Sequence, residues 1–221
     1  MHSIDLFYPL LTKPSKVVIT MHQKPDGDAM GSTLGLYHFL KGLGHDAVVI
    51  SPTNWADFLD WMPGINTVID FEKKKDTALA LINDADYLFC LDFNTLSRTK
   101  NMEAPLANAR GARILIDHHQ QPQTEVFAYG VSDTSKSSTC ELVYDLIMGS
   151  ENGAHISMDV ATCLYTGLMT DTGSFRFPAT TASVHRMIAH LKDLGLDHTV
   201  VHSHIFEHHN SSIHHHKLQL N

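Results

Sequence analysis

The sequence predicts an α/β fold, in which a parallel, Rossmann-like sheet carries helices on both faces. The first observation is that short β-branched apolar runs alternate with longer segments of helical periodicity, as is typical of βαβ units. The second is that acidic residues and histidines follow the ends of several of these runs. Ligands bind beyond the carboxyl ends of the strands in such sheets, so these polar residues indicate one shared site.

In the N-terminal half, residues 1–15 form a short amphipathic lead-in that ends at Pro14. Apolar, β-branched runs then predict strands over Lys16–Met21, Asp46–Ile50, Thr67–Phe71 and Asp86–Phe93. Helical periodicity predicts helices over Ala29–Lys41 and Glu72–Asn83. The segment Ser51–Gly64 is predicted as a loop or short helix.

In the C-terminal half, residues 97–110 are predicted to be helical in part, with an interruption at Pro105. Further strands are predicted over Ala112–Asp117 and Val126–Val131. Helices are predicted over Ser137–Met148, with Ser137 or Ser138 as N-cap, and over Ser157–Thr170, Thr180–Leu194 and residues 197–209. The remaining tail is rich in histidine and is interpreted as a solvated linker.

Length and composition allow one substantial core, or one domain and part of another. The chain has 221 residues, of which 43% are hydrophobic and 18% charged, and its formal net charge is −8. This charge disfavours a broad contact with duplex nucleic acid. It permits a phosphate substrate that meets divalent cations rather than Lys or Arg.

The sequence predicts neither a membrane segment nor export. No apolar run approaches the roughly 18 residues of a membrane helix, and the N-terminus lacks the pattern of a secretion signal. The cysteines Cys90, Cys140 and Cys163 lie in apolar runs without paired spacing. We therefore expect buried thiols in a cytoplasmic protein.

Candidate metal ligands first appear directly after the strand that begins at Lys16. His22, Asp26 and Asp28 lie on the turn between this strand and the next helix, and Gly27 is expected to permit the backbone bend. The positive end of the helix dipole would favour the carboxylates or a phosphate. An ordinary Asp-Gly turn beside a surface histidine explains the same residues equally well when they are considered alone.

Three later stretches carry the same chemistry. Asp92 ends an apolar strand, where an unpaired carboxylate is costly to bury; a helix N-cap is the alternative. Asp117 precedes the pair His118-His119, in which one imidazole can bind metal and the other can donate to a phosphoryl oxygen or a leaving group, while Asp117 can orient one of the two; a chance pair is the alternative. Asp171 ends a long apolar helix, a position that the helix dipole disfavours.

The combination of these residues indicates a metal site far more specifically than any one of them does. Carboxylates and imidazoles suit Mn²⁺ or a similar ion, although ligand type alone does not fix the metal. With Asp92 as a bridge, two ions can be held roughly 3.5–4 Å apart, which is suited to an in-line phosphoryl displacement. Arg176 is a candidate phosphate contact, with a surface charge as the alternative. The chain has no P-loop, zinc-finger spacing or Gly-x-Ser-x-Gly elbow.

These motifs resemble those of the DHH phosphoesterase superfamily. The run from His22 to Ser32 (HQKPDGDAMGS) is similar to its first motif, Asp92 to its second, Asp117-His118-His119 to its third and Asp171 to its fourth. The runs SSTCELVY from Ser137 and YTGLMTDTGSFRF from Tyr165 are most similar to the branch of nanoRNases and pAp phosphatases. The resemblance extends to about residue 200.

The resemblance implies roles for individual residues. His22, Asp26 and Asp92 would bind one divalent cation, and Asp28, Asp92, His118 and Asp171 would bind the other. The cations would be Mn²⁺, with Mg²⁺ or Co²⁺ as alternatives. His119 would contact the phosphoryl group attacked by a water between the ions, so that His119, Asp92 and Asp117 form the catalytic set. Ser137, Ser138 and Arg176 are expected to bind substrate.

The resemblance also implies a domain organisation. Members of this branch carry a second domain with a Gly-rich, His-containing motif, which does not occur here. We therefore expect residues 1–195 to form the catalytic domain and residues 196–221 to form a helix and inter-domain linker in a truncated chain. Such a fragment should bind metal but turn over poorly, because remote binding energy supports catalysis.

The expected function is hydrolysis of short oligoribonucleotides, of the 3′-phosphate of pAp, or of both. Hydrolysis of polyphosphate, pyrophosphate or the linear products of cyclic dinucleotides is an alternative that would use the same metal site. A metal- or nucleotide-binding module without catalysis is a third possibility. Formation of a homodimer is left open.

Overall fold

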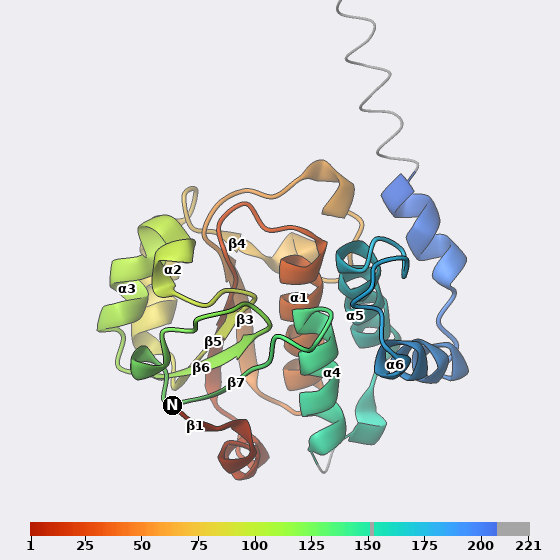
Figure 1. Cartoon of the computed structure of the whole chain (residues 1–221). Helices are drawn as coiled ribbons and strands as arrows, with labels where there is room; N and C mark the ends of the chain where they lie inside the picture. The colour runs from red at the N-terminus through yellow and green to blue at the C-terminus, as the bar shows by residue number, and fades with distance from the viewer. Residues whose placement is uncertain (151–152, 207–221) are drawn as a thin grey trace, which may run out of the picture.

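A computed structural model describes residues 1–150 and 153–206 of the chain. Its centre is a seven-stranded sheet with the order β1-β7-β6-β5-β2-β3-β4, in which every pair of neighbours is parallel. Figure 1 shows this sheet between two groups of helices. The strands are β1 (His2–Ser3), β2 (Lys16–Thr20), β3 (Asp46–Ser51), β4 (Ile69–Asp70), β5 (Tyr87–Leu91), β6 (Ala112–Asp117) and β7 (Tyr129–Ser132).

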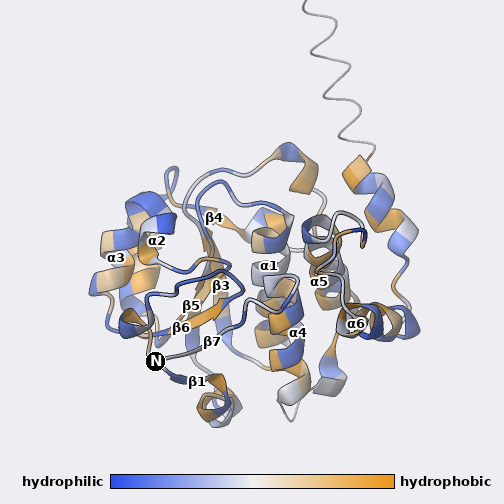
Figure 2. Ribbon diagram, in the orientation of Figure 1, coloured by the Kyte–Doolittle hydropathy of each residue, from blue (hydrophilic) through white to orange (hydrophobic). Residues whose placement is uncertain are grey.

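Helices cover both faces of the sheet, which confirms the predicted fold class. The α-helices are α1 (Gly27–Gly42), α2 (Lys75–Asp84), α3 (Glu103–Asn108), α4 (Thr139–Gly149), α5 (Met158–Asp171) and α6 (Ala182–Asp193). One core cluster joins alternate strand residues to α1, α4, α5 and α6, and a second joins the intervening strand residues to α2 and the segment around α3. Figure 2 shows the apolar residues concentrated in the strands between these layers.

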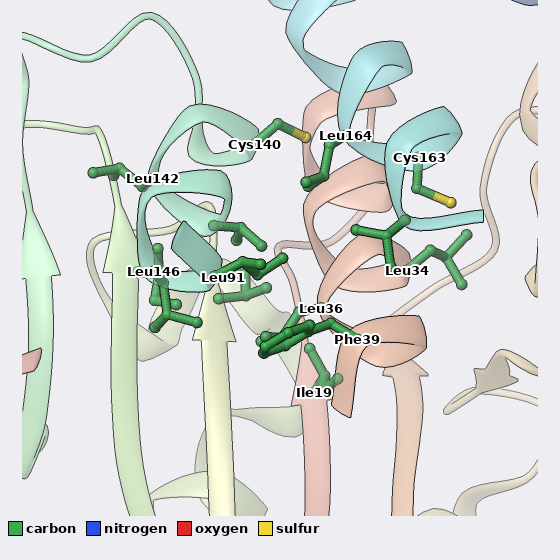
Figure 3. Close-up of a cluster of buried hydrophobic side chains, with 14 of the residues drawn as sticks. Ile19, Leu34, Leu36, Phe39, Leu91, Cys140, Leu142, Leu146, Cys163 and Leu164 are labelled. Carbon is green, nitrogen blue, oxygen red and sulfur yellow. The ribbon is translucent and has the colours of Figure 1, made fainter. Parts of the chain in front are cut away.

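The larger core lies under α1, α4 and α5. Figure 3 shows Leu36 and Phe39 of α1 above Ile19 of the sheet, with Leu146 of α4 beside Leu91. α1 packs very closely on α5, because a Cβ at Gly31 would lie only 2.6 Å from the backbone oxygen of Cys163. This contact fixes the relative positions of the two helices that carry Asp28 and Asp171.

Local structure differs from the sequence prediction in the lead-in and around Pro105. The lead-in contains a short strand, β1, which pairs with β7 at the edge of the sheet. The predicted interruption at Pro105 is wrong, because this residue lies in the first turn of α3, where the missing N–H would have no helical partner. The non-helical residue in this region is Lys100, with φ 53°.

The last described segment packs back on the body of the protein. Residues 198–206 are helical; the ring of His204 stacks on Trp61 at 4.5 Å, and His202 Nε2 lies 3.1 Å from the Tyr165 hydroxyl. The histidines of the predicted linker beyond residue 206 lie outside the described residues. None of the described helices combines the length and the apolar character that crossing a bilayer requires.

Candidate metal centre

The sheet changes its direction of growth at the pair β2 and β5. From β2 the chain builds outward through β3 and β4, and from β5 it builds outward through β6 and β7 on the other side. Loops that leave neighbouring strands in opposite directions open a crevice at the carboxyl edge of a parallel sheet. The loops after β2, β5 and β6 carry His22, Asp92 and His118 at this edge.

Asp92 lies at the centre of the site and faces two imidazoles. It is only 2% exposed, and its backbone is left-handed, with φ 62°. Its Oδ2 lies 3.4 Å from His22 Nε2, whereas its Oδ1 lies 3.5 Å from His118 Nε2. The two carboxylate oxygens therefore point at different groups of ligands, which is the arrangement that a bridging carboxylate needs.

One group of potential ligands consists of His22, Asp26 and Asp92, with one ligand atom from each lying within 4.8 Å of the others. His22 Nδ1 lies 2.8 Å from the Gln23 carbonyl and donates to it, which leaves Nε2 free to face the carboxylates. Asp26 caps α1 by accepting from the amides of Asp28 and Ala29 through Oδ1. Its Oδ2 lies 3.8 Å from His22 Nε2.

The conformation of this turn differs from the prediction for Gly27. Gly27 is the first residue of α1, and the left-handed residue of the turn is Lys24, with φ 49°. Gly27 is needed instead because a Cβ would overlap the side chain of Thr170 on α5. A close approach between two helices, rather than a backbone bend, therefore requires glycine here.

A second group consists of Asp28, His118 and Asp171. His118 Nε2 lies 3.8 Å from Asp28 Oδ2 and 3.6 Å from Asp171 Oδ2. Asp28 is almost completely buried and comes from the first turn of α1, whereas Asp171 is the last residue of α5. Residues 143 positions apart in the chain (171 − 28) are thus brought to one imidazole.

His119 forms a third group of potential ligands with Asp92 and His118, and it also pairs with Asp117. His119 Nδ1 lies 2.7 Å from Asp117 Oδ1 and 3.8 Å from Asp92 Oδ1. Asp117 is fully buried, and its Oδ2 has no hydrogen-bond partner among the described residues. Because His119 donates through Nδ1 to Asp117, the Nε2 atom of this half-exposed imidazole is available to a ligand.

The carboxylates and imidazoles shift one another's pKa values. Burial, reinforced by the charges of Asp92 and Asp171, raises the pKa of Asp28 well above its usual range. Burial alone would raise the pKa of Asp92, but hydrogen bonds from His118 and His22 outweigh it and lower this pKa. Burial also opposes charge on His118, yet its carboxylate neighbours raise its pKa to about 9.

This donor set fits divalent cations. Several carboxylates with little access to water repel one another, and burying such charges without a counter-charge is costly. Two divalent ions would supply the positive charge that Asp26, Asp28, Asp92 and Asp171 lack. Oxygen and imidazole ligands suit ions such as Mn²⁺, and the shared carboxylate of Asp92 suits a pair of them.

The predicted substrate contacts Ser137 and Ser138 are buried at the start of α4. The Ser138 hydroxyl accepts from the amide of Glu141 as N-cap, and the Ser137 hydroxyl donates to the Glu141 carboxylate. Their hydroxyls therefore order the first turn of α4, and their contact with substrate stays a prediction. Arg176 is exposed in the loop after α5, and its Nε donates to the Gly173 carbonyl at 2.7 Å.

Sequence reasoning missed the contribution of Thr139 and Cys140. Their backbone amides donate to the two oxygens of Asp28, at 2.6 and 2.9 Å, and the Thr139 hydroxyl donates to Asp92 Oδ1 at 2.9 Å. The signal was present, because a serine N-cap places the free amides of the following residues at the helix N-terminus, where they bind anions. The anion in this case is a carboxylate of the protein.

Comparisons with known proteins give matches over most of the chain. A family model described as the DHH family, N-terminal domain, matches residues 16–168. A bifunctional oligoribonuclease and PAP phosphatase, NrnA, from Thermus thermophilus is 35% identical over 180 residues, which cover 81% of this chain and 50% of that protein. The chain therefore spans about half the length of this curated relative.

Solved structures show the same architecture. An exopolyphosphatase-related protein from Bacteroides fragilis matches with a TM-score of 0.89 and 38% identity, over 92% of this chain and 60% of its own. RecJ from Thermus thermophilus in complex with Mn²⁺ matches with a TM-score of 0.53 and 16% identity, over 84% of this chain and 26% of its own. The second match shows a likeness of fold alone.

Proposed function

Because the chain belongs to the DHH family, we propose that it is the catalytic part of a metal-dependent phosphoesterase that hydrolyses short oligoribonucleotides, the 3′-phosphate of pAp, or both. The observation that carries the proposal is the position of Asp92, whose two oxygens face His22 and His118 at 3.4 and 3.5 Å. A buried carboxylate between two groups of ligands is what a pair of cations requires.

The two groups of ligands divide between the cations. His22, Asp26 and Asp92 would hold one ion, and Asp28, Asp92, His118 and Asp171 would hold the other. Mn²⁺ is proposed for both positions because of the mixed oxygen and nitrogen donors. When bound, the ions would supply charge neutralisation at the phosphoryl group and activation of a water molecule.

The remaining residues orient the ligands and the substrate. Thr139 and Cys140 hold the carboxylate of Asp28 through their backbone amides, so that its orientation does not depend on the ions. Asp117 holds His119 by its Nδ1 atom, which aims the opposite nitrogen at a phosphoryl oxygen or a leaving group. Ser137 and Ser138 order the start of α4 and are kept as proposed substrate contacts.

The substrate class is proposed from the relatives. The Thermus relative is named an oligoribonuclease and PAP phosphatase. Both reactions named there cleave a phosphate ester of a nucleotide, which requires one metal centre and a place for a nucleoside. Residues 1–195 are proposed as the catalytic domain and residues 196–221 as the link to a further domain. The three described cysteines are buried and unpaired, which favours the cytoplasm.

The test is hydrolysis of 5′-labelled di- to pentaribonucleotides and of pAp in the presence of Mn²⁺. We expect mononucleotide or phosphate to be released only with metal, and we expect Asp92→Asn to abolish this release. The assay should be run on this chain and on a longer version that also includes the region corresponding to the rest of the Thermus relative. Metal-independent hydrolysis, or full activity of Asp92→Asn, would contradict the mechanism.

A second candidate is hydrolysis of inorganic polyphosphate or pyrophosphate. It is favoured by the 38% identity to the exopolyphosphatase-related protein from Bacteroides fragilis. The same cations would serve this reaction, so the metal centre does not separate the two candidates. Competition between polyphosphate and an oligoribonucleotide for the same enzyme would separate them, because the preferred substrate inhibits hydrolysis of the other.

A further inference from the structure

A cavity beside the metal centre has no role in the assignments above. Its volume is about 230 Å³, and it lies between the end of α5 with its following loop, the 3₁₀ turn Asp57–Leu59 and the helix over residues 198–206. In Figure 1 the segments that line the cavity lie at the end of the molecule where α1 begins.

The cavity and the metal centre share a wall. Thr170 lines the cavity and directly precedes Asp171. Gly27 lies between Asp26 and Asp28, and it packs so closely on Thr170 that a Cβ would overlap this side chain. The cavity therefore lies one residue along the chain from Asp171, a proposed metal ligand.

The lining is mostly apolar, with one permanent cation. Phe58 and Phe206 supply aromatic rings, Met169 and Ile205 supply aliphatic surface, and Arg176 supplies a guanidinium. The Phe206 side chain is 49% exposed although it is a large aromatic group. In the described part of the chain, the Arg176 guanidinium hydrogen-bonds only through Nε, to the Gly173 carbonyl, so its terminal nitrogens are available to a ligand.

The loop that presents Arg176 has an unusual backbone. Gly173, Ser174 and Phe175 are consecutive left-handed residues, with φ of 57°, 58° and 67°. Thr172 holds them in place, because its hydroxyl accepts from the Phe175 amide and its carbonyl accepts from the Arg176 amide. Conformations of this kind persist only where surrounding contacts enforce them, and they concentrate at ligand sites.

From this lining and position we infer that the cavity binds a nucleobase of the substrate, the one attached to the phosphate held at the metal centre. Every base has a planar face that stacks on aromatic side chains, and the apolar walls exclude water from that face. Arg176 at the same cavity adds a planar cation that can stack on the base or contact its phosphate. An inorganic polyphosphate has no group that would fill such a space.

This inference rests on the proposed function, and binding of AMP and ribose 5-phosphate tests it separately from hydrolysis. The two ligands carry the same phosphate and sugar and differ in the base. By calorimetry of the whole chain with Mn²⁺, we expect AMP to bind about tenfold more tightly than ribose 5-phosphate. Phe206→Ala should remove this difference without changing the affinity for ribose 5-phosphate, and Phe206→Trp should preserve it.

Val200→Ala is the matched control. Val200 lies on the same helix and is also 49% exposed, but it does not line the cavity. We expect this variant to bind both ligands as the unmodified chain does. Equal affinities for AMP and ribose 5-phosphate, or no measurable affinity for either, would overturn the inference. Loss of hydrolysis with retained preference for AMP would instead count against the proposed function alone.

Discussion

At the scale of single residues, Asp92 is the group on which both proposed metal positions depend. Because its oxygens face His22 and His118 separately, Asp92→Asn should weaken binding of both Mn²⁺ ions by more than tenfold, whereas His22→Ala should weaken only one. Calorimetric titration with Mn²⁺ measures the affinity and number of ions. Asp70→Asn is the control, since Asp70 is also a buried carboxylate at the end of a strand but belongs to none of the ligand groups.

A second residue, Glu141, holds the segment at the start of α4 in place and makes the stability of the folded chain depend on pH. Its buried carboxylate accepts from the Ser137 amide and hydroxyl and from Ser183, and it pairs with Lys136 at 3.2 Å. Burial alone would raise its pKa, but these hydrogen bonds and the lysine outweigh burial and lower it. Because the pKa of Glu141 is lower in the folded chain than in the unfolded chain, its carboxylate stabilises the fold fully at pH values above the unfolded-state pKa of about 4.3. This stabilisation is lost as the pH falls through the lower pKa of the folded state.

Glu141→Gln should therefore reduce the free energy of unfolding by about 1.5–3 kcal/mol at pH 7, because charged hydrogen bonds are replaced by neutral, partly mismatched ones. Urea unfolding at several pH values measures the difference between variant and unmodified chain, which should shrink toward acid pH. Glu103→Gln, an exposed carboxylate in the first turn of α3, should stay within about 0.5 kcal/mol. A difference that is constant from pH 7 to below 4 would contradict this role.

At the scale of elements, the contact between α1 and α5 sets the spacing of the metal ligands. A methyl group at Gly31 would lie 2.6 Å from the Cys163 backbone oxygen and 3.0 Å from the Gly167 nitrogen, and backbone atoms cannot move aside as a side chain can. Gly31→Ala should destabilise the protein by about 1–3 kcal/mol. It should also weaken Mn²⁺ binding, because displacement of α5 moves Asp171. Urea unfolding and metal titration measure the two effects.

Gly42 gives a control within the same helix. It is the last residue of α1, and a Cβ there would meet nothing within 4 Å. Gly42→Ala should stabilise the protein by about 0.4–1 kcal/mol through a less flexible unfolded chain and leave metal binding unchanged. If both alanine variants behaved alike, packing between α1 and α5 would not be what positions Asp28 and Asp171.

The same contact shows what the sequence could and could not predict. Alternation of apolar runs and helical periods predicted the sheet, its helices and the order of the ligand-bearing loops, because these patterns are local. The sequence did not reveal that Gly27 and Gly31 are interface residues, because their requirement for glycine comes from atoms of the distant helix α5: the Thr170 side chain at Gly27 and backbone atoms at Gly31. Likewise β1 pairs with β7, a partner far along the chain that two residues of sequence cannot specify.

At the scale of the whole molecule, one rigid arrangement gathers every proposed ligand from the segment between His22 and Asp171. The family match over residues 16–168 covers nearly the same segment. We therefore expect binding of the proposed cations to require only this chain, and efficient turnover to depend on remote contacts to the substrate that the rest of a longer protein can provide. Metal binding and catalysis should therefore separate experimentally.

If metal binding and catalysis separate in this way, Mn²⁺ should strongly raise the unfolding temperature of this chain alone. A ligand that binds only the folded state at 100 times its dissociation constant adds about 2.7 kcal/mol of stability. For a chain of this size that corresponds to a rise in Tm of about 5–10 °C. Differential scanning calorimetry with Mn²⁺ should show this rise, and a chelator should reverse it.

Asp92→Asn should show a much smaller rise in Tm, since the mutation removes the negative charge shared by both proposed metal positions. A rise of equal size in Asp92→Asn would mean that Mn²⁺ stabilises the fold from elsewhere, and the absence of any rise would mean that the buried carboxylates are balanced by the imidazoles and not by metal.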